Sequence, residues 1–496
     1  MPSIRQAAVL VIAITAALGL VAYSATTDDN PPPTLDADVV RFGANVATAD
    51  PFELVFDESV IQTYDLTVSE DDWAWLNDNA LLEQYIPATL TFAGIEFDQI
   101  GIRYKGAFGG LRFCFDGAGN QTCDKLSFKL KFNEYDSRGR FFGLKRLNLH
   151  SMNGDPTKLH DALSYGLFRA AGIAAPRTAF AWITINGEPQ GLFIAIEEID
   201  DRFVAANFPD GGEGNLYKEI WPEHEGPERY LAALDTTIPA ADDPNVDKMQ
   251  RFAADLLAAE DDDARFQALS TWTDIDGFVR QVAVDRFVDH WDGIFAWYCV
   301  EIDRTDGQVR AGPCFNHNYF WYEDARADRL TLIPWDLDHT FEFPSPIETA
   351  FRMPAWNDLE ASCELRQVFL GIPARAPACD PLLRSLVTAG WDTYVAAAQN
   401  LLDHPAFQVE AIQDRIDTLV ALIEDRVAED PNALSLSEWR REVAGLRNDI
   451  VLMRSTFADD IAPPVRLDHR CLIRDASHAR GPLWQESNDP CPSLPR

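Results

Sequence analysis

Leu330–Phe341 reads LTLIPWDLDHTF, and the rest of the chain is organised around this stretch. The apolar run at its start predicts a short strand, which Pro334 ends because proline lacks the N–H of a strand ladder. Asp336 and Asp338 follow two residues apart, so in extended chain their side chains point the same way. Two neighbouring carboxylates repel each other unless a proton or a cation such as Mg²⁺ or Mn²⁺ lies between them. The alternative is a turn in which the Asp side chains make local hydrogen bonds.

Length and charge restrict the class of protein. The chain has 496 residues, of which 47% are hydrophobic, and a formal net charge of -37. This length suffices for two or three domains or for one large two-lobed unit. The acidic composition favours solubility and cation binding, and it excludes a nucleic-acid binder, which needs a basic patch.

The N-terminus predicts export. Residues 1–24 are typical of a signal peptide, with Arg5 before an apolar run and Ala22-Tyr23-Ser24 as a cleavage site. Cleavage would leave no stable membrane span, and an uncleaved anchor is the alternative. Residues 25–50 are a polar, Pro-rich flexible linker. We therefore expect a monomer that is secreted, periplasmic or in the cell envelope.

The cysteines agree with export, because disulfides persist outside the cytosol. All 8 fall as neighbours along the chain, although sequence alone does not prove connectivity. A zinc site is the alternative, but no CxxC motif is present and the histidines do not cluster near the cysteines. The expected bonds are Cys114–Cys123, Cys299–Cys314, Cys363–Cys379 and Cys471–Cys491, the last of them clamping a C-terminal extension over residues 463–496.

Residues 51–225 predict a sheet with one helix. The stretch Leu126–Phe132 alternates apolar and polar residues, which is the period of a half-buried strand. Asp155, followed by proline, predicts a helix start, and Gly172 predicts its end. Asn186-Gly187 predicts a hairpin turn between two further strands.

This first half has features of a nucleotide-binding lobe. A buried basic residue on the third strand and an acidic residue on the facing helix would form a kinase-like lobe, and Lys129 and Asp161 are the candidates. The alternative is that Lys129 is a solvated strand residue. The glycine-rich loop Gly106–Gly110 could bring backbone N–H groups to phosphates, with a plain flexible hairpin as the alternative.

Residues 226–462 predict a mainly helical lobe that carries polar residues on a hairpin. The apolar helix IDGFVRQVAVDRFVDHW ends just before Asp292. The strands NYFWYED and LTLIPWD predict a hairpin with Asn318 at one base and Asp336 at the other. Phosphoryl transfer needs a carboxylate for the hydroxyl proton, an Asp and an Asn for metal ions, and a Lys for the phosphates. Asp292, Asn318, Asp336 and Lys129 supply these groups.

The chain resembles the CotH kinase family of secreted or spore-coat-associated atypical protein kinases. The matching stretches, within about residues 60 to 345, are IGIRYKG, KLSFKLKF, RLNLHS, INGEPQGLFIAIEEID, GNLYKE, VDRFVDHWD, NHNYFWYED and IPWDLDHTF. The resemblance implies an α+β, protein-kinase-like two-lobed fold. Its N-lobe is an antiparallel sheet with one helix, and its C-lobe is mainly helical with a β-hairpin at the active site. It also implies ATP with Mg²⁺ or Mn²⁺, and transfer to Ser or Thr of exported proteins.

The resemblance also implies roles for individual residues. Asp292 matches the catalytic carboxylate and Asn318 the metal-binding amide. Asp336 matches the metal-binding Asp, with Asp338 beside it.

The nucleotide contacts are less defined by the resemblance. Strand order favours Lys129 as the nucleotide lysine, with Lys105 and Lys218 as alternatives. Glu197 and Glu198 lie where a kinase hinge would begin and could touch adenine or ribose.

Two other functions remain open from the sequence. A catalytically inactive kinase-like scaffold or binding protein of the cell envelope is favoured by Ala107-Phe108 in the glycine-rich loop and by the long insertion between Asp292 and Asn318. A hydrolase that uses Asp336 and Asp338 as paired carboxyls is the third hypothesis. It lacks an aromatic sugar platform other than tryptophans that we expect in the core.

Overall fold

The computed structural model describes residues 52–106, 111–116, 118–208, 212–302, 309–342, 356–360, 362–367 and 372–461. These residues form two compact units. The first unit combines the described residues up to Arg169 with Ala174–Gly212 and Ile412–Gly445, and the second contains Glu213–Ala411 and the described segment from Leu446. The expected signal peptide, linker and C-terminal extension, with Cys471 and Cys491, lie outside the described residues, as does most of the glycine-rich loop.

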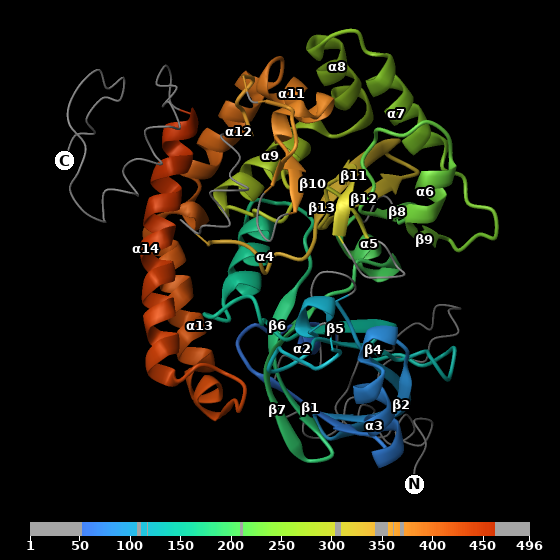
Figure 1. Cartoon of the computed structure of the whole chain (residues 1–496), viewed down its shortest axis with the longest axis vertical. Helices are drawn as coiled ribbons and strands as arrows, with labels where there is room; N and C mark the ends of the chain where they lie inside the picture. The colour runs from blue at the N-terminus through green and yellow to red at the C-terminus, as the bar shows by residue number, and fades with distance from the viewer. Residues whose placement is uncertain are drawn as a thin grey trace, which may run out of the picture. The chain divides into compact units, whose positions relative to one another are not determined.

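The first unit is built on a closed barrel with the strand order β1-β2-β3-β4-β5-β7-β6 (Figure 1). Neighbouring strands are antiparallel except β1 and β6, which run parallel. The expected antiparallel sheet is therefore corrected to a barrel that one parallel pair closes. The strands are β1 (Gln62–Thr67), β2 (Ile86–Phe92), β3 (Ile95–Tyr104), β4 (Phe128–Lys131), β5 (Arg146–His150), β6 (Thr178–Ile185) and β7 (Glu188–Ile196).

The period of the sequence decides which side chains fill this barrel. Phe128 and Leu130 of β4 are 2% and 0% exposed, whereas Lys129 between them is only half-buried. The expected turn between β6 and β7 is also present, since Asn186 and Gly187 both have positive φ, 54° and 85°. Such angles match the type I′ turn of a two-residue hairpin.

The helix expected from Asp155 begins later than the sequence suggested. The Asp155 carboxylate accepts hydrogen bonds from Thr157 N at 2.7 Å and from His160 N at 2.8 Å, so it caps a turn before the helix. The helix itself is α4 (His160–Ala170). The unit contains more than one helix. Among them, α3 (Glu70–Asp78) has the cap at Ser69 that the sequence indicates, and most of α13 (Val409–Glu429), a helix that the sequence also indicates, belongs to this unit. The remaining helices, α2 (Phe52–Val55) and α5 (Asp201–Asn207), were not expected.

The loop after α13 is bound to the barrel. Beside this loop, Arg440 Nε in the first turns of α14 (Leu436–Ile461) lies 2.8 Å from Glu424 Oε1 of α13. In the connecting loop, Asp430 Oδ2 accepts from Lys125 Nζ at 2.8 Å and from Leu192 N of β7 at 2.9 Å. Both charged side chains are buried, so this ion pair lies within the apolar interior of the unit.

The second unit contains two sheets and helices. One sheet has the order β13-β12-β8-β9, and the other has the order β11-β10-β15-β14. The expected hairpin is present as β12 and β13, with Phe320 opposite Ile333. The strands are β8 (Gly214–Lys218), β9 (Leu234–Ile238), β10 (Trp297–Ile302), β11 (Val309–Phe315), β12 (Tyr319–Asp324), β13 (Arg329–Pro334), β14 (Arg366–Gln367) and β15 (Pro373–Arg375). The helices include α6 (Glu228–Ala233), α7 (Asp247–Ala258), α8 (Asp262–Trp272), α9 (Ile275–Phe287), α11 (Pro381–Val387) and α12 (Trp391–Asp403).

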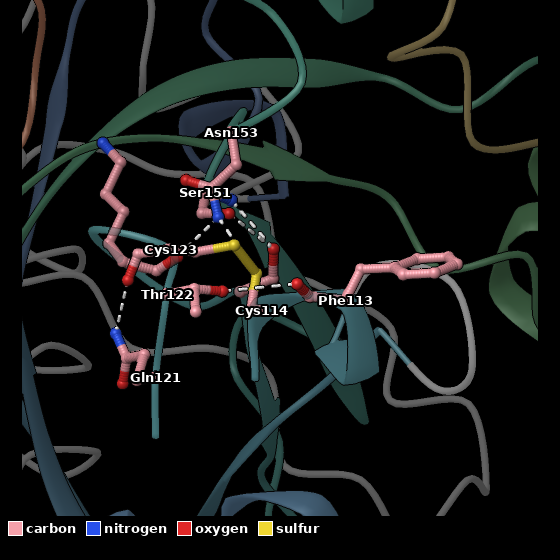
Figure 2. The surroundings of a disulfide bond; sticks show 9 residues. Phe113, Cys114, Gln121, Thr122, Cys123, Ser151 and Asn153 are labelled. Carbon is pink, nitrogen blue, oxygen red and sulfur yellow. Dashed lines mark hydrogen bonds between the residues drawn. A yellow bond between two sulfur atoms is a disulfide. The ribbon is translucent and has the colours of Figure 1, made fainter. Parts of the chain in front are cut away.

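Three of the expected disulfides lie within the described residues and are formed: Cys114–Cys123, Cys299–Cys314 and Cys363–Cys379. Figure 2 shows the first of them, where Thr122 Oγ1 donates to Phe113 O at 3.4 Å and Gln121 Nε2 donates to Cys123 O at 2.7 Å. The bond therefore closes a small hydrogen-bonded loop between β3 and β4. Within the part of the chain that the structure describes, no helix has the length and hydropathy to cross a bilayer.

The Asp430–Lys125 pair predicts a large stability effect. Asp430→Ala leaves a buried ammonium without its carboxylate, and we expect a loss of about 3–5 kcal/mol in the free energy of unfolding of the first unit. Urea titration followed by circular dichroism measures it. Glu429→Ala, which removes a neighbouring exposed carboxylate, should change stability by about 0.5 kcal/mol or less. Equal losses of stability in Asp430→Ala and Glu429→Ala would contradict the proposed importance of the buried Asp430–Lys125 ion pair.

Candidate active site in the second unit

The end of α9 brings Asp292 to the site. The chain leaves the helix through Asp289, whose φ of 53° turns the backbone sharply. Val288 O accepts a hydrogen bond from Phe341 N at 2.9 Å, which fixes the helix end to the segment after β13. His290 is buried and its Nδ1 lies 3.1 Å from Asp285 Oδ2 of the helix. The end of α9 and the segment after β13, which are about 50 residues apart, are thus joined close to Asp292 in the sequence.

The hairpin places Asn318 and Asp336 at one end. Tyr319 pairs with Pro334, and Trp335 N donates to Asn318 O at 3.2 Å, so the residues that flank the hairpin lie across from each other. Asn318 and Asp336 have φ of 64° and 54°. Non-glycine residues at positive φ cost about 1–3 kcal/mol each and concentrate at functional sites.

The positive φ of Asp336 corrects one detail of the sequence argument. The strand ends at Pro334 and the chain is not extended at Asp336, so the two Asp residues are not related by strand geometry. Asp336 and Asp338 are nevertheless both half-buried, while Leu337 between them is fully buried. Burial of the leucine therefore leaves both carboxylates nearer the surface.

Asp292 is held by hydrogen bonds from three side chains. Its Oδ1 accepts from Tyr298 OH and from His317 Nε2, the latter at 3.0 Å. Its Oδ2 accepts from Asn318 Nδ2 at 3.0 Å, and the same nitrogen donates to Asp292 O at 2.8 Å. Because Asn318 uses its nitrogen in this way, its side-chain oxygen remains as the atom that could bind a metal.

The neighbouring charged groups shift the pKa values of Asp292 and His317. Burial alone would raise the pKa of Asp292, but His317, His339 and the Tyr298 hydrogen bond outweigh it and hold that pKa well below its usual range. Burial lowers the pKa of His317, but Asp292, Glu219 and Asp336 together raise it to about 9. Asp292 is thus a carboxylate paired with a cationic imidazole at neutral pH.

A second histidine–carboxylate pair, His339 with Glu342, lies in the loop after Asp336. Burial lowers the pKa of His339, but Asp338 and Glu342 among others raise it to about 10. Glu342 accepts from Trp291 Nε1 at 3.0 Å and lies 3.1 Å from His339 Nδ1. From the sequence, His317 and His339 could each be a metal ligand, a proton carrier or a hydrogen-bonded neighbour of the acidic residues, and in the structure each is in hydrogen-bond contact with a carboxylate. No sequence pattern linked Tyr298 or Glu342 to the site.

The donor set can be tested for a metal. Within the described residues, no group of three or more His, Cys, Asp and Glu is arranged to hold an ion. Mg²⁺, however, is usually held by one or two carboxylates together with substrate phosphates and water. The Asp336 carboxylate and the Asn318 side-chain oxygen, both at the same end of the hairpin, fit that smaller set.

In the first unit, Lys129 pairs with Glu198 and not with Asp161. Lys129 Nζ lies 2.7 Å from Glu198 Oε1, which also lies 3.3 Å from Arg146 Nε. Asn148 Nδ2 donates to the other oxygen of Glu198 at 2.5 Å. Burial raises the pKa of Glu198, but Lys129, Arg146 and Asn148 outweigh burial and lower it to about 2.

Asp161 belongs to a different cluster. His150 of β5 lies between it and Lys105, with His150 Nδ1 3.8 Å from Asp161 Oδ2 and His150 Nε2 in contact with Lys105 Nζ. Lys105 and Lys129 therefore remain two separate candidates for the nucleotide lysine.

The remaining predicted contacts have structural partners. Both oxygens of Glu197 bind the Arg177 guanidinium, each at 3.0 Å. Lys218 lies in the second unit on β8, opposite Phe320 in the sheet, with Glu219 3.6 Å away. Their roles as nucleotide contacts stay predictions.

Comparison with known proteins gives a consistent assignment. The sequence profile described as "CotH: CotH kinase protein" matches residues 102–452. The chain is 20% identical over 294 residues to the inner spore coat protein H of Bacillus subtilis (strain 168), covering 58% of this chain and 70% of that protein. It is 24% identical over 253 residues to Invasin CotH2 of Rhizopus delemar, covering 48% and 40%. The crystal structure of the Helicobacter pylori proinflammatory kinase CtkA aligns with 68% of this chain and 91% of that one, at a TM-score of 0.25 and 8% identity.

The Glu198 network predicts a defined pH dependence. The pKa of Glu198 is lowered to about 2 in the folded state, so its contribution to stability is present above the unfolded pKa of about 4.3 and is lost as pH falls from there toward 2. Glu198→Gln should therefore lower the melting temperature at pH 7, and the gap to the wild type should shrink steadily as pH falls through this window. Thermal melts at pH 7, 5 and 3 measure the gap. A gap that does not change with pH would refute the charge-based account.

Proposed function

Since this chain belongs to the CotH kinase family, we propose that it is an exported protein kinase that transfers the γ-phosphoryl group of ATP to Ser or Thr of extracytoplasmic proteins. The observation that carries the proposal is the hydrogen-bonded group of Asp292 and Asn318, with Asp336 at the same hairpin end. A carboxylate, an amide and a second carboxylate are the side chains that kinase chemistry needs in a C-terminal lobe.

Asp292 is proposed as the catalytic residue. Its carboxylate accepts the hydrogen bond of the acceptor hydroxyl and takes its proton as the oxygen attacks the γ-phosphorus. The bond from that phosphorus to the β,γ-bridging oxygen breaks, and ADP leaves with the electron pair. Because the carboxylate is a weak base, its main contribution is to orient the hydroxyl, which can account for a large share of the barrier.

Asn318 and Asp336 are proposed to hold Mg²⁺ or Mn²⁺ through their side-chain oxygens, with Asp338 as a further ligand. When bound, such an ion neutralises charge on the phosphates and so assists their transfer. The hairpin contributes by fixing the two residues at one end of a hydrogen-bonded ladder.

In the first unit, Lys129 is proposed as the nucleotide lysine. Kinases hold a lysine on a strand through an ion pair with a glutamate, and the Lys129–Glu198 distance of 2.7 Å is consistent with that arrangement. Lys105, which contacts His150, is the alternative within the same unit.

Export is part of the proposal. The three disulfides within the described residues suit an oxidising compartment, because cytosolic reductants keep such thiols reduced. The expected signal peptide supports the same location.

The second candidate function is a kinase-like binding protein of the cell envelope without catalysis. Ala107-Phe108 in the glycine-rich loop and the long insertion between Asp292 and Asn318 motivate this candidate. The Rhizopus relative is named an invasin and not a kinase.

Phosphate transfer is the direct test of the proposal. We expect the full-length chain, incubated with γ-labelled ATP and Mn²⁺ or Mg²⁺, to label itself or a generic protein acceptor. Asp292→Asn and Asp336→Ala should each reduce labelling about 100-fold or more, because each removes an interaction made in the transition state. Asp328→Ala, at the opposite turn of the same hairpin, is the matched control and should keep wild-type labelling. A wild type that transfers nothing would leave the binding-protein candidate.

Metal binding gives a separate prediction. Titration of Mn²⁺, followed by electron paramagnetic resonance in the presence of ADP, should show a dissociation constant raised about tenfold or more in Asp336→Ala and in Asn318→Ala. Asp328→Ala again serves as the control. Unchanged Mn²⁺ affinity in both site variants would place the metal elsewhere.

A further inference from the structure

Strands β10 and β11 lie between Asp292 and Asn318 in the sequence, and the proposed function leaves this pair, here called the ribbon, without a role. Strands β10 and β11 pair antiparallel, and Cys299 lies directly opposite Cys314, where a disulfide joins them. On its other edge β10 pairs with β15, with Tyr298 opposite Ala374. The residue just before the disulfide, Tyr298, is therefore held in register from both sides.

This ribbon delivers two of the three side chains that hold Asp292. Tyr298 OH donates to Asp292 Oδ1, and His317, just beyond the end of β11, approaches the same oxygen through Nε2 at 3.0 Å. The two rings touch edge to face with centroids 5.2 Å apart. Tyr298 is 7% exposed and packs in a small apolar cluster with Trp291 and Ala296. Strand pairing on both sides thus fixes the backbone of Tyr298, and burial restricts the movement of its side chain.

We propose that the ribbon is a brace for the catalytic carboxylate, in which Tyr298 and His317 are positioning residues and the Cys299–Cys314 disulfide makes their position sensitive to reduction. This inference rests on the proposed function of Asp292. The carboxylate can rotate about its side-chain bonds, and donors to both of its oxygens restrict that rotation. Among the described residues, loss of the donors to Oδ1 leaves the hydrogen bond from Asn318 to orient it.

If the ribbon acts as a brace, its loss should affect kcat but not the binding of ATP or Mn²⁺. Asn318 and Asp336 are positioned by the β12–β13 ladder, which has its own backbone hydrogen bonds and does not depend on the ribbon disulfide. Release of the ribbon should therefore lower kcat while the KM for ATP and the affinity for Mn²⁺ change little. A general loss of folding would change all of them.

The first test replaces the phenol. Tyr298→Phe in the full chain should lower kcat for phosphate transfer tenfold or more, which corresponds to about 1.4 kcal/mol, with the KM for ATP within twofold of the wild type. Tyr322→Phe is the matched control, because it removes a tyrosine hydroxyl that donates to Glu213 O at 2.9 Å in the same unit. His317→Gln, which retains a donor, should keep more activity than His317→Leu. Equal kcat in Tyr298→Phe and Tyr322→Phe would overturn the proposal.

The second test breaks the disulfide. Dithiothreitol supplies two electrons and two protons by thiol–disulfide exchange, so that the Cys299–Cys314 bond becomes two thiols while the reagent closes to its cyclic disulfide. The double variant Cys299→Ala with Cys314→Ala should reproduce the fall in kcat and make it independent of the reagent. The corresponding double variant at Cys363 and Cys379 is the control, and it should keep wild-type kcat in the oxidised state.

A measurement that does not depend on phosphate transfer tests the brace apart from the proposed kinase function. Hydrogen–deuterium exchange of peptides that cover residues 289–297 should accelerate in Tyr298→Phe and in the Cys299/Cys314 double variant, and stay at the wild-type rate in both controls. Accelerated exchange in a chain that transfers no phosphate would support the brace and reject the kinase proposal. Unchanged exchange in both ribbon variants would reject the brace.

Discussion

A carboxylate that is largely removed from water needs hydrogen-bond donors, and Asp292 obtains them from residues that follow it within 26 positions of the sequence. Tyr298 comes from β10, His317 follows β11, and Asn318 begins the β12–β13 hairpin. Tyr298 is held by the pairing of β10, whereas His317 and Asn318 are consecutive residues of the link between β11 and β12. The second unit therefore positions one acidic side chain from two places, a strand and a short link between strands.

The same region contains backbone conformations that the fold has to stabilise. Asp289, Asn318 and Asp336 all have positive φ, and the hydrogen bonds from Phe341 N to Val288 O and from Trp335 N to Asn318 O hold the chain in these conformations. Strain of this kind persists only where the surroundings determine the geometry.

Local patterns predicted local structure well. The β12–β13 hairpin, the burial of Phe128 and Leu130 and the Asn186-Gly187 turn all follow from period-2 alternation and turn chemistry. The start of α4 was placed too early because the Asp155 carboxylate accepts from Thr157 N as well as from His160 N, so that a turn precedes the helix.

Contacts between distant segments could not be predicted in this way. The parallel β1–β6 pair that closes the barrel joins residues 119 positions apart, and no local period encodes it. Lys129 met Glu198, 69 residues away, because a buried ammonium pairs with whatever carboxylate the fold brings near it. Tyr298 gave no signal, since a tyrosine beside a cysteine in a strand is also typical of a core position.

The most direct measurement is a crystal structure of the full chain grown with Mn²⁺ and a non-hydrolysable ATP analogue, with the metal located by its anomalous scattering. Our account predicts a Mn²⁺ peak within coordination distance of the Asp336 carboxylate and the Asn318 side-chain oxygen, with Asp292 still bound to Tyr298 and His317. A nucleotide and a metal bound elsewhere, or no metal at all with the analogue absent, would contradict it.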